Sequence, residues 1–193
     1  MKKTKFQKKS SKFSTNLLKD AFRLYLQKGF DTESAIKAID LLQRFFKFNY
    51  PTQDTEKNAI FAAAIYIVSR SPSTFPNDMS IPQFSKIFNV KATSIEWFLK
   101  KIIKKLKIIK IHDLRNYPYF IDSKSVIAKV IESVTYKELT TTKIKDILGL
   151  DKYDKDTVAS SVVDELMYRL KILPSVFKLS LYKLIYQLIE KKE

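Results

Sequence analysis

The chain has 193 residues, of which 45% are apolar, so it can form one large domain or two small ones with a genuine core. It has no cysteine and one histidine, His112, which excludes disulfides, cysteine-ligated zinc and thiol nucleophiles and argues against His-based triads and His-rich metal sites. Two glycines, Gly29 and Gly149, are too few for a β-sandwich or a glycine-rich phosphate loop. The net charge of +16 predicts a phosphate-rich partner.

The charge is distributed unevenly along the chain. Residues 1–12 carry six lysines and no acid, residues 91–110 carry seven lysines and Glu96, and residues 151–166 carry five acids against two lysines. This pattern favours a polyanion-binding surface over a uniformly solvated, lysine-rich one. No apolar run reaches the roughly 18 residues that a membrane span needs. The basic start lacks the apolar segment of a signal peptide, so we expect an intracellular protein (cytoplasm, nucleoid or nucleus) with no membrane partner.

Residues 1–13 are expected to form a flexible basic arm, because lysine dominates them and no helical apolar period is visible. Such an arm would either bind phosphate or serve as a disordered, solubilising tail. The lysines that would contact phosphate are Lys2, Lys3, Lys5, Lys8, Lys9 and Lys12.

Three helices are predicted next. The first begins at Ser14 or Thr15 and ends at Gly29, the second begins at Asp31 and ends before Pro51, and the third begins at Asp54. Residues 59–68 of the third are apolar nearly all round, which places this helix in the middle of a bundle. The apolar residues expected in the first two are Leu17, Leu18, Phe22, Leu24, Tyr25, Ile36, Ile39, Leu42, Phe45 and Phe46.

After a proline-bearing loop at residues 71–78, residues 80–106 predict a helix-turn-helix. Ser80 with Gln83, and Thr93 with Glu96, are candidate capping boxes for its two helices. Asn89 is placed at the turn, because asparagine tolerates the left-handed backbone conformation well. Ser85 is the small residue at the helix contact, and the apolar positions are Phe84, Phe88, Val90, Ile95 and Phe98. The same geometry also occurs in helical proteins that never bind nucleic acid.

The second helix of this motif carries the candidate binding residues. We expect Lys91, Thr93 and Trp97 to approach bases or sugars, and four further lysines to approach phosphates, namely Lys100, Lys101, Lys104 and Lys105. The alternatives are a solvated lysine face and a Trp97 that packs against a neighbouring helix or the second domain. Glu96 would repel phosphate if it pointed outward, so a local capping role is expected for it.

The second half is also expected to be mostly helical. Residues 108–111 either extend the fifth helix or start a strand, residues 111–121 form a linker with a turn at residues 116–118, and residues 122–193 form a smaller domain. Helices are predicted at residues 126–131, at residues 141–148 before Gly149, from Asp154 or Asp156 through Leu170, and at residues 179–189 after Pro174. This order suits a winged helix with residues 172–179 as its wing, or a diverged copy of the first half.

An alanine-rich helix with residues 62–70 (AAAIYIVSR) is followed by the proline-bearing loop, by residues 81–90 (IPQFSKIFNV) and by the basic helix. In this order the segments resemble a cyclin-fold repeat of the transcription factor IIB type. The resemblance implies an all-α protein: a five-helix cyclin-like domain at residues 14–110, then a degenerate second cyclin repeat or a winged helix. It also implies binding to double-stranded DNA beside the TATA-box-binding protein, with RNA polymerase as a further partner. The chain departs from the family in lacking the cysteines of the zinc ribbon and a second alanine-rich helix.

We therefore expect a DNA-binding transcription factor or regulator that is not an enzyme and uses no cofactor or metal. Asp151, Asp154 and Asp156 alternate as in a calcium loop, but the glycine and closing glutamate of that loop are missing. The alternative function is a cyclin-fold adaptor that binds a kinase, a polymerase or a transcription factor without contacting DNA. In that case the acidic second half would contact a basic partner.

Overall fold

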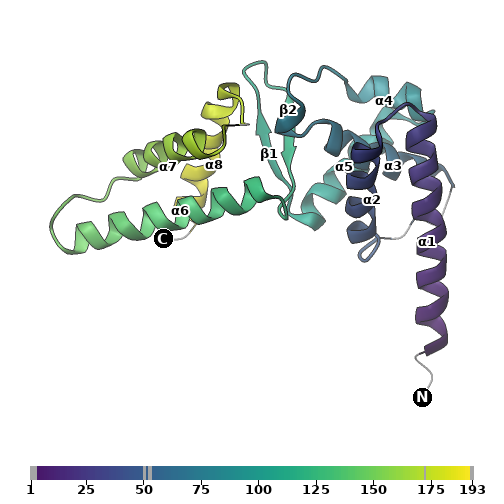
Figure 1. Cartoon of the computed structure of the whole chain (residues 1–193), viewed down its shortest axis with the longest axis horizontal. Helices are drawn as coiled ribbons and strands as arrows, with labels where there is room; N and C mark the ends of the chain where they lie inside the picture. Colours follow the sequence, from purple (N-terminus) through teal and green to yellow (C-terminus); the bar gives the residue numbers. More distant parts are fainter. Residues whose placement is uncertain (1–3, 50, 52–53, 172, 192–193) are drawn as a thin grey trace. The chain divides into compact units, whose positions relative to one another are not determined.

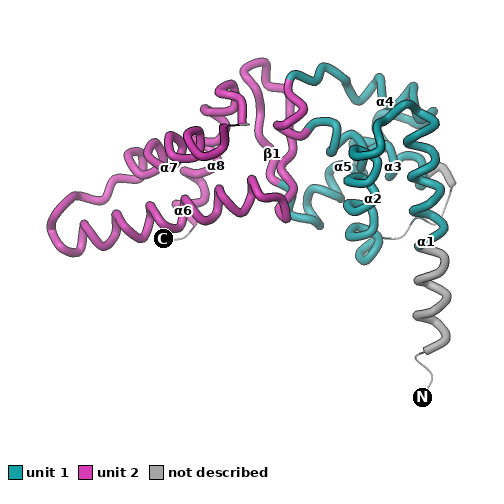
Figure 2. The backbone as a smooth tube through the Cα atoms, viewed as in Figure 1, with its two compact units in different colours: residues 1–70, 76–108 teal, residues 71–75, 109–193 magenta. Residues whose placement is uncertain are grey.

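The computed structural model describes residues 4–49, 51, 54–171 and 173–191, with side chains from residue 15 onward except those of residues 54 and 55. The chain is mostly helical and divides into two compact units (Figure 2). Unit 1 comprises Met1–Arg70 and Pro76–Ile108, and unit 2 comprises Ser71–Phe75 and Ile109–Glu193. No helix in the described part is both long and apolar enough to cross a membrane.

Unit 1 is the predicted five-helix bundle. Its helices are α1 (Thr4–Gln27), α2 (Thr32–Phe45), α3 (Asp54–Ser69), α4 (Ile81–Phe88) and α5 (Ala92–Leu106) (Figure 1). Residues 59–67 of α3 are all buried, and α3 packs against α2, α4 and α5. The prediction that this helix forms the centre of the bundle is confirmed. Its alanines let the neighbouring helices approach closely, because a methyl group takes up little of the space between two helix axes.

The predicted end of α1 and start of α2 are confirmed. Gly29 has a φ of 82°, the left-handed conformation that closes a helix, and the Phe30 N–H donates to the carbonyl of Tyr25 across it. Asp31 then caps α2, since its Oδ1 accepts the N–H of Ser34 at 2.8 Å. The start of α1 is a correction: the helix begins at Thr4 and not at Ser14, so it runs through most of the predicted arm. Lysine and glutamine are good helix formers, and a helix anchored by its later turns extends easily.

Five of the ten apolar positions predicted for the first two helices are buried, namely Leu17, Tyr25, Leu42, Phe45 and Phe46, and the other five are not. The buried residues are Leu17, Ala21 and Tyr25 on α1 and Ala35, Ala38, Leu41, Leu42 and Phe45 on α2. The predicted positions Leu18, Phe22 and Ile39 are half-buried, and Ile36 is 57% exposed. Both helices have two apolar faces, and the face with alanines is the one in the core. Close packing favours the small residues there, so periodicity alone selected the wrong face for Ile36.

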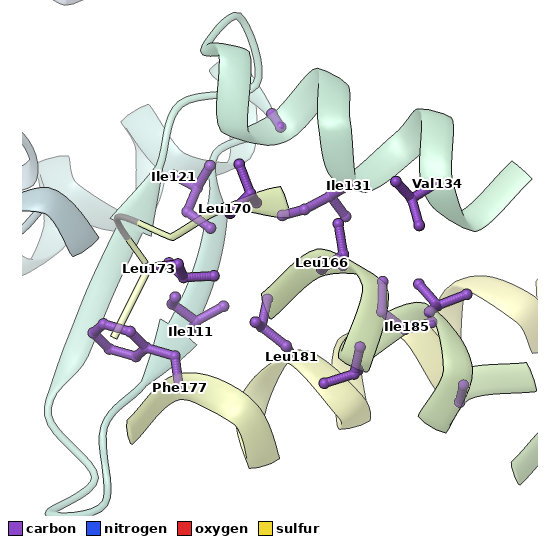
Figure 3. Packing of buried hydrophobic residues seen from close by; sticks show 14 of the residues in the cluster. Ile111, Ile121, Ile131, Val134, Leu166, Leu170, Leu173, Phe177, Leu181 and Ile185 are labelled. Carbon is purple, nitrogen blue, oxygen red and sulfur yellow. The ribbon is translucent and has the colours of Figure 1, made fainter. Parts of the chain in front are cut away.

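Unit 2 contains a β-hairpin and three helices. The strands β1 (Ile109–His112) and β2 (Pro118–Ile121) pair antiparallel with Ile109 opposite Ile121, and the helices are α6 (Val126–Ile147), α7 (Lys155–Arg169) and α8 (Lys178–Glu190). Figure 3 shows Ile111 and Ile121 of the hairpin facing a core built from all three helices. That core includes Ile131, Val134, Leu166, Leu170, Phe177, Leu181 and Ile185.

The predicted linker at residues 111–121 is wrong, because these residues form most of the hairpin. Asn116 has a φ of 65° in its turn, and the buried Asp113 carboxylate accepts the N–H groups of Arg115 and Tyr117 at 2.9 and 2.8 Å. Residues 71–75, predicted as a loop, include a short 3-10 helix, η1 (Pro72–Thr74). Phe75 follows it and contacts the rings of Tyr119 and Phe177 at centroid distances of 5.6 and 5.5 Å, which explains why this segment belongs to unit 2.

The helices predicted at residues 126–131 and 141–148 are a single helix, α6. Thr142 lies in its interior, where the side-chain hydroxyl donates to the carbonyl of Glu138 at 2.9 Å, so it caps nothing. Gly149, with a φ of 66°, follows the end of α6 as predicted, and Asp154 caps α7 by accepting the N–H of Thr157. The predicted wing is wrong: residues 173–179, its largest described stretch, hold the 3-10 helix η2 (Ser175–Phe177) and the start of α8.

Candidate nucleic-acid interface

The turn between α4 and α5 has the predicted geometry. Asn89 adopts the left-handed conformation with φ 51° and ψ 51°, and the Val90 N–H donates to the carbonyl of Ser85 at 3.1 Å. The Ser85 hydroxyl donates in turn to the carbonyl of Val90 at 2.6 Å. The first capping box is also confirmed, since the Ser80 N–H donates to Gln83 Oε1 at 2.6 Å. These bonds fix where α5 begins and in which direction it leaves the turn.

The second predicted capping box is wrong. Helix α5 begins at Ala92, and its N-cap is Lys91, which makes no side-chain cap. Thr93 and Glu96 therefore lie inside the first turns of the helix, where both are exposed. Because the turn at Asn89 is short, α5 already begins at Ala92, whereas Thr93 as the N-cap would make the helix begin after residue 93.

A cluster of aromatic rings holds α4 against the rest of unit 1. Phe84 and Phe88 are buried and stack on each other at a centroid distance of 6.3 Å. Phe30, in the turn before α2, contacts both rings at 5.8 and 6.0 Å, and Tyr66 of α3 meets Phe84 edge-on at 5.1 Å. Such ring pairs add to the free energy gained from burial alone, so α4 is firmly attached to the bundle.

The loop that leads into α4 is tied to the end of α3 by Arg70. This residue is 1% exposed, and its Nη1 donates to the carbonyls of Asn77 and Met79 at 2.5 and 3.3 Å. The Asn77 side-chain amide donates back to the carbonyl of Ser69 at 2.6 Å. The Arg70 guanidinium therefore holds the loop before α4 against the end of α3.

Helix α5 has one buried and one exposed face. Its buried side chains are Ile95, Phe98, Leu99, Ile102 and Leu106, and this side packs on α3, α4 and α2. The exposed side chains follow helical spacing along the other face and are Thr93, Glu96, Trp97, Lys100, Lys104 and Lys105, with the half-buried Lys101 between them. Lys91 is exposed at the N-cap. The bundle therefore does not enclose this helix, and the candidate residues of α5 lie together along one side.

Trp97 is not packed away as the alternative interpretation required. Its side chain is 49% exposed, and the Lys101 Nζ lies 3.2 Å from the ring centroid. Phe98 meets the same ring edge-on at 4.5 Å. A second such pair is found one turn further on, where the Lys105 Nζ lies 6.0 Å from the ring of Phe48, which is 60% exposed. Exposed aromatics and lysines thus alternate along this surface.

Phe48 and Lys86 are two exposed residues near this site that the sequence analysis did not select. Phe48 lies after α2, just beyond the predicted apolar position Phe46. Lys86 lies in the last turn of α4, beside the turn that leads to α5. A helical-wheel analysis of α4 would have found Lys86, because its position is opposite to the buried Phe84 and Phe88.

The positive charge of α5 is not neutralised within the described part of the chain. None of Lys91, Lys100, Lys101, Lys104 and Lys105 forms a salt bridge there. Glu96 is the one acid among residues 91–107. Of the predicted arm lysines, Lys2 and Lys3 lie outside the described residues, and so do the side chains of Lys5, Lys8 and Lys9.

The three aspartates with calcium-loop spacing have other contacts. Asp154 caps α7, and Asp156 accepts a hydrogen bond from the Tyr182 hydroxyl, which raises the pKa of Tyr182 to about 12. No cluster of three or more His, Cys, Asp or Glu side chains suited to a metal occurs among the residues that the structure describes.

No protein-family model matches the chain, and no curated protein matches it either. The function of the chain is therefore inferred from the geometry and charge of α4 and α5.

Proposed function

We propose that this protein binds double-stranded DNA through the exposed face of α5 and acts in transcription without catalysing a reaction. The observation that supports this is the row of lysines along the exposed face of the second helix in a helix-turn-helix, none of which forms a salt bridge with the described residues. A helix of 15 residues is about 22 Å long, and its diameter including side chains fits a major groove that is about 12 Å wide.

The two ends of α5 have different chemistry. In helix-turn-helix proteins the first residues of the second helix reach base edges, which assigns Lys91, Thr93 and Trp97 to the bases. The apolar ring of Trp97 suits contact with a thymine methyl group. The lysines of the later turns suit phosphates, which supply affinity but little sequence information. Binding should therefore be mostly electrostatic, with limited base readout.

The role in transcription rests on the resemblance to a cyclin-fold repeat of the transcription factor IIB type. The buried alanine-rich α3 and the following α4–α5 pair are consistent with such a repeat. Without cysteine the chain has no zinc ribbon, so we propose a regulator or architectural factor at promoters. The TATA-box-binding protein and RNA polymerase are the protein partners that this resemblance suggests.

The alternative, an adaptor that does not contact DNA, has less support. An exposed Trp97 set in an apolar patch would support it, but Lys101 lies over the Trp97 ring and Lys100 is exposed on the same helix. In the adaptor the acids of the second half would contact a basic partner. Two of these, Asp164 and Glu165, are paired with Lys178 at 2.8 Å and Arg169 at 2.5 Å.

The test is a charge reversal on α5, with fluorescence anisotropy of a labelled duplex of about 20 base pairs as the readout. The variant replaces Lys100, Lys101, Lys104 and Lys105 with glutamate. The matched control makes the same change in net charge on unit 2, at four exposed lysines: Lys124, Lys129, Lys137 and Lys145. At about 0.15 M salt exposed charges are screened beyond about 8 Å, so position matters more than net charge.

We expect the α5 variant to lose at least about 100-fold in affinity, because each lost phosphate contact contributes to counterion release. The control should lose no more than about threefold. Equal losses in both variants would mean that net charge, and not this surface, causes binding.

A further inference from the structure

A groove of about 400 Å³ lies between α1 and α2 in unit 1, whose two helices pack side by side (Figure 1). Its floor is apolar and is formed by Leu18, Phe22, Ile36 and Ile39. Thr15, Lys19 and Arg23 of α1 complete its lining. None of these residues belongs to α5, so the groove is separate from the proposed DNA surface.

The apolar floor is not part of the core of unit 1. The core uses the opposite faces of the same helices, through Leu17, Ala21 and Tyr25 on α1 and through Ala35 and Ala38 on α2. The second apolar face of each helix is left at the surface, where Ile36 is 57% exposed. Apolar residues that gather at the surface in this way are typical of interaction sites.

The charge around the groove is positive. Lys19 and Arg23 lie one helical turn apart on α1, and neither forms a salt bridge in the described part of the chain. The acids on the α2 side are already neutralised: Glu33 pairs with Lys37 at 2.6 Å, and Asp40 with Arg44 at 2.9 Å. Asp20 is the remaining acid on this part of α1. It lines a neighbouring depression together with Lys57 and Asn58, and Arg23 borders both depressions.

We propose that this groove binds an acidic amphipathic helix of a partner protein. The apolar side chains of such a helix, spaced at i, i+3 or i+4, and i+7, would lie on the floor. Two carboxylates one turn apart would meet Lys19 and Arg23, because four residues of a helix rise about 6 Å on both partners. A basic helix would be repelled, so the groove discriminates by charge. The groove and the α5 surface share no residue, so we expect a substitution in one to leave binding at the other unchanged.

The test uses a fluorescein-labelled synthetic peptide of about 15 residues, long enough to form a helix when bound. It has leucine at i, i+4 and i+7, with glutamate on both flanks. The comparison peptides are a shuffled sequence of the same composition and a version with lysine in place of glutamate. Binding to the full chain is measured by anisotropy. We expect the glutamate peptide to bind at least about tenfold more tightly than either comparison peptide.

Two variants locate the site. Ile36→Glu should weaken binding of the glutamate peptide by about tenfold or more, since it adds a repelling charge to the apolar floor. Ile147→Glu is the matched control: it makes the same change at an isoleucine of α6 that is 82% exposed. It should leave the affinity for the glutamate peptide unchanged. Both positions are exposed, and far-UV circular dichroism establishes that each variant folds.

A charge swap provides the third arm. In Lys19→Glu/Arg23→Glu the preference should reverse, so that the lysine peptide binds more tightly than the glutamate peptide. DNA affinity of Ile36→Glu should stay within about twofold of the parent, and the α5 charge-reversal variant should keep its peptide binding. These two results make failure of this proposal distinguishable from failure of the DNA-binding proposal.

Equal binding of all three peptides would overturn the proposal, as would full binding by Ile36→Glu. Sedimentation measurements test whether the chain self-associates through the groove. If the chain self-associates and Ile36→Glu abolishes this, a second copy of the chain occupies the groove, and the proposed acidic helix does not.

Discussion

Replacing Asn89 with valine should destabilise unit 1 through the backbone alone. Asn89 has φ 51° and ψ 51°, and its side chain is exposed and makes no hydrogen bond in the described part of the chain. What asparagine contributes here is therefore tolerance of the left-handed region. A β-branched residue clashes with its own backbone in this region and costs about 1–2 kcal/mol. For a chain of this size that corresponds to a fall in Tm of about 2–8 °C.

The assay is thermal unfolding followed by the fluorescence of Trp97, the single tryptophan, which reports on unit 1. The companion variant is Asn89→Gly, which removes the clash and should keep the stability within about 0.5 kcal/mol of the parent. If glycine destabilises as much as valine, the asparagine side chain itself matters, and the argument from φ is refuted. If neither variant shifts Tm, the turn does not require a left-handed residue.

Three further predictions concern buried or titrating groups. Arg70→Met should cost about 2–4 kcal/mol in urea unfolding, because two loop carbonyls lose a charged donor; a change below about 1 kcal/mol would show that these hydrogen bonds do not stabilise the loop. Burial raises the pKa of Tyr25 well above its usual value, so its stability contribution is present below about pH 10 and is lost as the pH rises further. Tyr25→Phe should reduce that alkaline loss, and an unchanged loss would place its cause elsewhere. Burial, together with Lys110 and Lys183, lowers the pKa of His112. The folded state then binds this proton less readily than the unfolded chain, so stability falls as the pH drops below about 6.5, and His112→Gln should flatten that fall.

The elements predicted well are those with local chemical signals at their ends. Gly29 and Gly149 follow helix ends, Asp31 and Asp154 cap helix starts, and Asn89 forms the turn. Each of these residues acts through its own backbone conformation or through a hydrogen bond to a residue a few positions away. Such signals do not depend on how the rest of the chain packs, so they can be read without a structure.

The β-hairpin could not be predicted with the same ease. Residues 109–112 contain only two apolar side chains, Ile109 and Ile111, which are too few to distinguish a strand from an extension of α5, and the turn at Asn116 lacks glycine. What makes them a strand is pairing with residues 118–121 and burial against the helices of unit 2. These are tertiary contacts, and they override weak local preferences.

The remaining misses also come from tertiary packing. Thr141 and Thr142 suggested a helix start, but threonine disfavours a helix only slightly, and α6 continues through them. On α2 the isoleucines suggested the buried face, yet the alanines are buried. At the candidate site, helical spacing alone grouped Trp97, Lys100 and Lys104 on one face, and they are exposed together.

The central claim is that the lysines of α5 neutralise DNA phosphates, and the salt dependence of affinity tests it most directly. If Lys100, Lys101, Lys104 and Lys105 each displace a counterion, the slope of log K against log salt is about −3.6. The affinity for a duplex should then fall about 150-fold between about 50 and 200 mM salt, and Lys104→Ala should reduce the slope by about 0.9. An affinity that stays flat over this range, or a slope that Lys104→Ala leaves unchanged, would contradict the account.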